Sequence, residues 1–202
     1  MLYFYIFICY NTDGFRGDSM LKNEDILDEK DKRLRKISDD VTFPLEKEDK
    51  EAIDKIIEYL TNSQIEKIAK KYDLRPGMGM AAIQLGIPKR YFVIVHEQEE
   101  KETFKNYIIV NPKIVSESEE MIYVEEGEGC LSVNREVEGI VPRKARVTIE
   151  GYDIDGNKIK VRGREELAVA FQHEIDHLNG ILFTDRIDKS NPFKNSDIYR
   201  AI

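Results

Sequence analysis

The spacing of apolar residues along the chain predicts two helices. In residues 48–71 apolar side chains recur every three or four positions, as on one face of a helix, with a break near residues 61–63. Residues 165–178 repeat this period and predict a second helix. Between them the pattern changes to short runs of β-branched and aromatic residues, which are typical of strands.

These strand-like runs lie at residues 91–95, 107–110, 121–124, 145–151 and 158–161. An Asp-Gly pair at positions 155–156 separates the last two and predicts a hairpin turn. The turn is acidic, but it lacks the ligand spacing of an EF-hand, so calcium binding is disfavoured. Residues 97–105 are highly charged and predict a loop in solvent. With no repeat or linker, this order of elements predicts one α+β domain.

Both ends of the chain differ from this central region. Residues 22–50 are mostly charged and predict an arm over the core, anchored by Leu27, Leu34, Ile37, Val41, Phe43 and Leu45. Positions 2–10 form an apolar run without a preceding basic residue or a cleavage site, so a start placed too early, or residues added for expression, is favoured over a signal peptide. We therefore expect residues 1–19 to lie outside the fold and residues 20–202 to form the domain. The tail after residue 188 is polar.

Composition narrows the classes of function. The 202 residues include 31 Lys and Arg against 39 Asp and Glu, a net charge of −8, which argues against nucleic-acid binding of its own. No apolar run is long enough to span a membrane. Two cysteines exclude a disulfide-rich secreted scaffold, and we expect a cytoplasmic protein.

The strongest chemical signal is the sequence HEIDH at residues 173–177. Residues four apart lie on one face of a helix, so His173 and His177 can bind one metal ion. Glu174 lies beside that face and can take a proton from a water that the ion activates. Asp176 is interpreted as a residue of a surface turn rather than one that orients a ligand.

A catalytic ion needs a third protein ligand. Downstream of His177 there is no further histidine or glutamate, and the acids that remain are Asp185, Asp188 and Asp197. Upstream, Cys130 lies in the sequence EGCLS at residues 128–132. A cysteine there could be a small apolar residue, but beside a glycine and a glutamate it is better placed as a thiolate ligand.

Residues 77–84, GMGMAAIQ, form a third motif. The glycines would let the backbone approach a substrate, and Gln84 offers an amide donor to a developing oxyanion. Alone this motif is weak, and it predicts a tight turn before helical residues. It lacks the features of a phosphate-binding loop.

Together the three motifs resemble those of the peptide deformylase family, especially the Gram-positive type, in order and spacing. Two positions depart from the usual pattern, Ile83 and Asn134, where many members carry proline. The resemblance implies antiparallel or mixed sheets packed around a central HExxH helix. It also implies an enzyme that removes the formyl group from the N-terminal formylmethionine of nascent polypeptides and releases formate.

The same resemblance implies the roles of the site residues. Cys130, His173 and His177 would hold one divalent ion, expected to be Fe²⁺, with Zn²⁺, Ni²⁺ or Co²⁺ able to substitute. Glu174 would be the base, while Gln84 and the backbone N–H of Leu131 would stabilise the oxyanion. The candidate substrate-binding residues are Met78, Gly79, Gly129, Leu167, Val169 and Ala170. We expect a monomer that meets formylmethionyl chains and touches the ribosome at most transiently.

Two other functions remain open from the sequence. A zinc peptidase would share the HExxH helix but would take its third ligand downstream. A degenerate homologue would keep the fold and bind peptides without hydrolysing them, for example if Ile83 narrowed the cleft.

Overall fold

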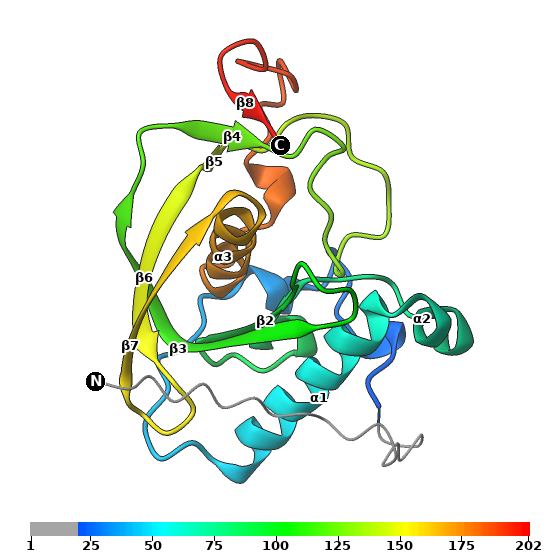
Figure 1. The fold of residues 1–202 in the computed structure, drawn as a ribbon, viewed down its shortest axis with the longest axis vertical. Helices are drawn as coiled ribbons and strands as arrows, with labels where there is room; N and C mark the ends of the chain where they lie inside the picture. The colour runs from blue at the N-terminus through cyan, green and yellow to red at the C-terminus, as the bar shows by residue number, and fades with distance from the viewer. Residues whose placement is uncertain (1–19) are drawn as a thin grey trace.

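A computed structural model of the chain describes residues 20–202, and the expectations for residues 1–19 lie outside the described part. In Figure 1 helix α3 (Glu165–Leu178) runs through the middle of the molecule, with strands on more than one side of it. Its bounds are those predicted from the apolar period. Ten of its residues are buried, which explains why its sequence is more apolar than that of a surface helix.

The larger sheet is fully antiparallel. It contains β1 (Gly79–Ala81), β2 (Tyr91–Glu97), β3 (Phe104–Glu117), β6 (Arg146–Tyr152) and β7 (Lys158–Arg164), in the order β1-β2-β3-β6-β7. Strands β2, β6 and β7 were predicted, and the run predicted at residues 107–110 is part of the longer β3. The glycine motif was predicted as a turn before helical residues; instead β1 is an edge strand that pairs with β2 and leads into a short 3-10 helix, Ala82–Leu85.

Strand β2 is buried on both faces. Tyr91, Val93 and Val95 pack in the core cluster that includes residues of helix α1 (Lys47–Gln64), whereas Phe92 and Ile94 pack in the cluster that includes residues of α3. Successive side chains of a strand point to opposite faces, so helices on both faces require a continuous apolar run. This explains the sequence YFVIV.

The smaller sheet is mixed, as the fold class allowed. Strand β4 (Met121–Tyr123) pairs antiparallel with β5 (Arg143–Lys144) and parallel with β8 (Arg200–Ala201). Only Ala145 separates β5 from β6, so one stretch of chain passes from the smaller sheet to the larger. Strand β8 lies at the end of the polar tail, and the polarity of the tail did not predict a strand there.

Helix α1 and the short helix α2 (Glu66–Tyr72) replace the single broken helix of the prediction. The break falls at Ile65, which has extended backbone angles, rather than at residues 61–63. Asn62 and Ser63 continue α1 because both are buried and hydrogen-bonded, Ser63 to the carbonyl of Leu60 at 2.9 Å.

The charged arm lies over the core as predicted, with one exception. Leu34, Val41 and Leu45 are buried, but Ile37 is 72% exposed and is not an anchor. The predicted hairpin turn between β6 and β7 is confirmed. There the carboxylate of Asp153 accepts hydrogen bonds from the backbone of Asp155 and Asn157, both at 2.9 Å, so it serves the turn itself.

Within residues 20–202, no helix is both long and apolar enough to cross a lipid bilayer.

Candidate metal centre and active site

A cavity of about 510 Å³ opens beside α3. Its walls come from the segment that enters β1, from the loop after β4 and from one face of α3. Ten of the residues expected to act in the site line it: Met78, Gly79, Gln84, Gly129, Cys130, Leu131, Val169, Ala170, His173 and Glu174. The fold therefore brings the three sequence motifs to one cavity.

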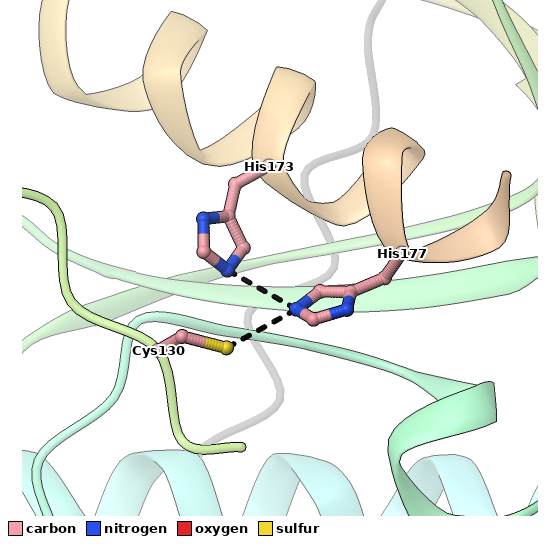
Figure 2. A group of neighbouring side chains, drawn as sticks. All are labelled: Cys130, His173 and His177. Carbon is pink, nitrogen blue, oxygen red and sulfur yellow. Dashed lines mark hydrogen bonds between the residues drawn. The ribbon is translucent and has the colours of Figure 1, made fainter. Parts of the chain in front are cut away.

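Cys130, His173 and His177 meet at the inner wall of the cavity, where Figure 2 shows the sulfur and the two imidazoles turned toward one another. The Sγ of Cys130 lies 3.2 Å from Nε2 of His177, and that atom lies 3.2 Å from Nε2 of His173. All three donor atoms lie within 4.8 Å of one another. Both histidines are buried, and Cys130 is half-buried.

The three donor atoms fit an ion with tetrahedral coordination. Bonds of about 2.0–2.1 Å to nitrogen and 2.3 Å to sulfur place two nitrogens about 3.3 Å apart, and nitrogen and sulfur about 3.6 Å apart. The two distances from Nε2 of His177, 3.2 Å to Nε2 of His173 and 3.2 Å to Sγ of Cys130, are close to those values. Three protein donors leave one position open, which is the arrangement of a catalytic rather than a structural ion.

Burial and neighbouring charges set the protonation of the two histidines. Burial opposes the charged form of His173, but the Cys130 sulfur and the Glu128 carboxylate raise its pKa well above the usual value. Burial and the neighbouring His173 lower the pKa of His177. An incoming ion therefore replaces a proton held in this cluster, so metal affinity increases with pH.

Glu174 lies next to the cluster and is buried. Burial raises the pKa of its carboxyl to about 7, as suits a group that takes up and returns a proton near neutral pH. Its Oε2 has no hydrogen-bond partner among the described residues. A Cβ on Gly79 would lie 2.5 Å from its Oε1, so a side chain at position 79 would displace this carboxylate.

Gln84 is held with its amide directed toward Cys130. Its Oε1 accepts from the backbone N–H of Ala81 at 2.9 Å, and its Nε2 donates to Oγ of Ser132 at 3.1 Å and lies 3.9 Å from Sγ of Cys130. The backbone N–H of Ser132 lies 3.4 Å from the same sulfur. Ser132 thus orients both Gln84 and Cys130, a role that the sequence analysis missed.

A buried charge network behind the histidines was also missed. Nδ1 of His173 lies 2.6 Å from Oε1 of Glu128, and Glu128 binds Arg143 at 2.6 Å. Arg143 is 2.6 Å from Asp176, which also accepts from the more exposed Arg186. The interpretation of Asp176 as a surface residue is wrong, because its side chain is buried in this network.

The network orients the metal ligand. Burial alone would raise the pKa of the Glu128 carboxyl, but Arg143 and His173 hold it lowered to about 2. An ionised Glu128 accepts the Nδ1–H of His173 and leaves Nε2 free to bind an ion. The spacing of the charged residues at positions 128, 143 and 176 does not predict this network. Their role in orienting His173 becomes apparent only from their burial in the structure.

We expect Arg143→Met to lower the free energy of unfolding by about 3–5 kcal/mol, because it removes the buried cation between the buried carboxylates of Glu128 and Asp176 and leaves them only His173 and the half-exposed Arg186 as partners. Urea denaturation of the metal-loaded protein measures this. Arg186→Met is the matched control, since Arg186 binds the same Asp176 from a half-exposed position and should cost about 1 kcal/mol or less. Equal losses in the two variants would contradict the prediction.

The apolar wall of the cavity includes Met78, Val169 and Ala170. Leu167 was expected there, but it does not line the cavity and packs instead against the core cluster between α3 and the larger sheet. Leu167 precedes the fully buried Phe171 and Leu178 by four and eleven residues, which places it on the face of α3 that packs in this core cluster. Three charged lining residues, Arg75, Glu128 and Glu166, were not predicted to act in the site.

Comparisons with known proteins agree with this geometry. The profile of the family described as polypeptide deformylase matches residues 23–193. The peptide deformylase of Shouchella clausii is 49% identical over 176 residues, or 87% of this chain and 96% of the relative. That of Listeria monocytogenes is 47% identical over 173 residues, or 86% of this chain and 94% of the relative. The predicted resemblance to deformylases of Gram-positive bacteria is therefore confirmed.

Solved structures show the same fold. The crystal structure of a peptide deformylase from Legionella pneumophila matches with a TM-score of 0.65 and 32% identity, covering 82% of this chain and 86% of that one. The peptide deformylase from Thermotoga maritima matches with a TM-score of 0.63 and 31% identity, covering 81% and 96%. The chain therefore belongs to the peptide deformylase family, which removes the formyl group from N-terminal formylmethionine.

Proposed function

We propose that Cys130, His173, His177 and Glu174 form the catalytic centre with which this chain performs its family's reaction. The observation that carries the proposal is that the three donor atoms lie within 4.8 Å of one another, while Cys130, His173 and Glu174 line one cavity and His177 is buried directly behind them. The reaction hydrolyses the bond between the formyl carbon and the amine of the N-terminal methionine. Its products are formate and a peptide with a free amino group.

The ion held by Cys130, His173 and His177 is proposed to be Fe²⁺, with Zn²⁺, Ni²⁺ or Co²⁺ able to substitute. When bound, such an ion supplies Lewis-acid chemistry, which makes water nucleophilic near neutral pH and polarises a carbonyl group. Mixed sulfur and nitrogen donors suit any of these ions, so the choice of iron rests on the family resemblance rather than on the donor set.

Glu174 moves the proton. Its carboxylate takes a proton from the attacking water and then gives it to the amine as the formyl carbon–nitrogen bond breaks. One group can do both because burial places its pKa near neutrality. The unpartnered Oε2 is the oxygen available for this transfer.

Gln84 and the N–H of Leu131 stabilise the charge that develops on the formyl oxygen. The side-chain amide of Gln84 is held in place by a hydrogen bond at its oxygen, from the N–H of Ala81, and one at its nitrogen, to Ser132. The backbone N–H of Leu131 has no acceptor among residues 20–202. Donors that are oriented in advance are worth about 3 kcal/mol each in comparable enzymes.

The substrate occupies the rest of the cavity. Met78, Val169 and Ala170 offer an apolar wall to the methionine side chain, and Gly79 and Gly129 let the peptide backbone approach. A Cβ on Gly129 would meet nothing within 4 Å, so there is open space for a peptide at that position.

Neither alternative function agrees as well with these contacts. For a zinc peptidase, two of the three downstream acids are engaged elsewhere, since Asp185 pairs with Arg35 and Asp188 with Lys194. Among the described residues the two histidines are grouped with Cys130 and with none of these acids. For a degenerate homologue, Ile83 was the suspected obstruction. It packs in the core and does not line the cavity.

The domain organisation, the location, the oligomeric state and the substrates are inferred from the family. We propose that residues 20–202 act as one catalytic domain, as a cytoplasmic monomer. Its substrates would be nascent formylmethionyl chains, with no more than transient contact with the ribosome.

The direct test is formate release from formyl-Met-Ala-Ser by protein prepared anaerobically, with its metal content measured. We expect stoichiometric formate and free peptide amine. If fully metal-loaded protein releases no formate, the degenerate homologue becomes the better interpretation. Cleavage of an internal peptide bond instead would favour the peptidase.

A further inference from the structure

Strand β8 and the residue after it lie beside the segment that leads from β4 into the cavity, as Figure 1 shows for the two strands. The backbone N–H of Ile202 donates to the carbonyl of Tyr123, and the N–H of Glu125 donates to the carbonyl of Ile202, both at 3.0 Å. Between these two partners lies Val124, which lines the cavity. The backbone therefore holds Ile202 alongside a residue of the cavity wall.

The side chain of Ile202 packs behind that wall. It joins a small apolar cluster built around Ile122, Ala145 and Val169, against which Val124 also packs. Val124 and Val169 line the cavity, whereas Ile202 does not. Because Val169 belongs to α3 and Val124 follows β4, the cluster supports two sides of the cavity at once.

Arg200 attaches the same segment to both sides of the cavity. Its guanidinium donates to the carboxylate of Glu165, the first residue of α3, at 2.8 and 2.9 Å. It also donates at 2.9 Å to the carboxylate of Glu120, which directly precedes β4. Half-exposed ion pairs are worth little one by one, but here they share a single guanidinium. Together they link β8 to α3 and to β4.

We propose that Ile202 and Arg200 set the width of the methionine pocket, as positioning residues that act through Val124 and Val169. The inference rests on the proposed function, because it assumes that the methionine side chain lies against the wall that includes Val169. When a packed side chain is removed, its neighbours relax partly into the space that it leaves. A wall that has lost Ile202 would therefore admit a bulkier first residue.

The test compares kcat/KM for formyl-Met-Ala-Ser and formyl-Phe-Ala-Ser at equal metal content. A methylene group in direct contact with a substrate changes selectivity by about 10–200-fold, so Ile202→Ala, which acts from behind the wall, should lower the ratio of the Met to the Phe peptide by about three- to tenfold. Ile202→Val loses a single carbon and should keep most of the wild-type ratio. A loss of folded protein lowers both values equally, so the ratio distinguishes a change of the pocket from instability.

Arg200→Gln tests whether the two residues act through one segment. It removes the ion pairs with Glu165 and Glu120 and should lower the same ratio in the same direction. Mutations of independent sites add in free energy, so their effects on the ratio would multiply. Both of these changes release the same segment, and the double variant should therefore change the ratio by less than the product of the two single effects.

Ile198→Ala is the matched control. It removes the same side chain from the same tail, but Ile198 is 72% exposed and does not pack in the cluster, so the ratio should stay at the wild-type value. The proposal is overturned if Ile202→Ala leaves the ratio unchanged, if Ile198→Ala lowers it as much, or if the effects of Ile202→Ala and Arg200→Gln multiply in full. Absence of formate from formyl-Met-Ala-Ser with metal-loaded wild type would instead show that the proposed function itself has failed.

Discussion

Replacing Glu174 with glutamine is expected to lower kcat for formate release by about 10²–10⁴-fold, the usual contribution of a general base and acid. Glutamine keeps the shape of the side chain and can occupy the space that Gly79 leaves open. It cannot take up a proton, so both proton transfers lose their carrier. The measurement is steady-state formate release from formyl-Met-Ala-Ser at equal metal content.

The metal content of the Glu174→Gln variant distinguishes a chemical from a structural defect. Glu174 is not one of the three donor residues, so bound metal should stay at the wild-type level. Glu174→Asp is a useful companion, because it retains a carboxylate but withdraws it from its place beside Gly79. We expect it to keep more activity than Glu174→Gln. Wild-type activity in Glu174→Gln would mean that another group moves the proton.

Replacing Cys130 with serine is expected to reduce bound metal from one ion per chain to a small fraction. A serine hydroxyl is neutral at pH 7 and a poor ligand for soft or borderline ions, whereas a thiolate binds them strongly. The loss should exceed the roughly 10–100-fold drop in affinity that follows loss of a residue that only orients a ligand. Metal analysis after dialysis measures it.

Two controls make the Cys130→Ser experiment specific. Cys9→Ser removes the other cysteine of the sequence and should leave metal content unchanged. Asp185→Asn removes a downstream acid that a peptidase-type site could have used. The wild-type protein loaded with Co²⁺ should also show a thiolate-to-cobalt absorption band that Cys130→Ser lacks. Equal metal content in Cys130→Ser and wild type would contradict the proposed ligand set.

Local periodicity was sufficient for much of the fold. Helix α3 and the turn between β6 and β7 were predicted correctly because their signals lie within a few residues: an apolar period in α3 and an Asp-Gly pair in the turn. Strand β2 was found as well, since burial on both faces leaves a continuous apolar run.

Other elements depend on partners distant in the sequence. Ile37 is exposed although it resembles its buried neighbours, because nothing packs over it. The tail strand β8 exists only because β4 offers it an edge, and its own residues carry no strand pattern. Helix α1 extends past the predicted break because Asn62 and Ser63 find buried hydrogen-bond partners.

For the site, the sequence alone determined which residues could hold an ion and move a proton, since spacing on one helix turn places His173, Glu174 and His177 together. Only the tertiary structure decided what surrounds them. It showed that Gly79 makes room for the Glu174 carboxylate and that Glu128, Arg143 and Asp176 form a buried network behind His173. It also showed that Leu167 packs away from the cavity while Glu166 lines it. The physical reason is that burial, ion pairing and steric fit depend on which distant segments meet, and no local pattern encodes that.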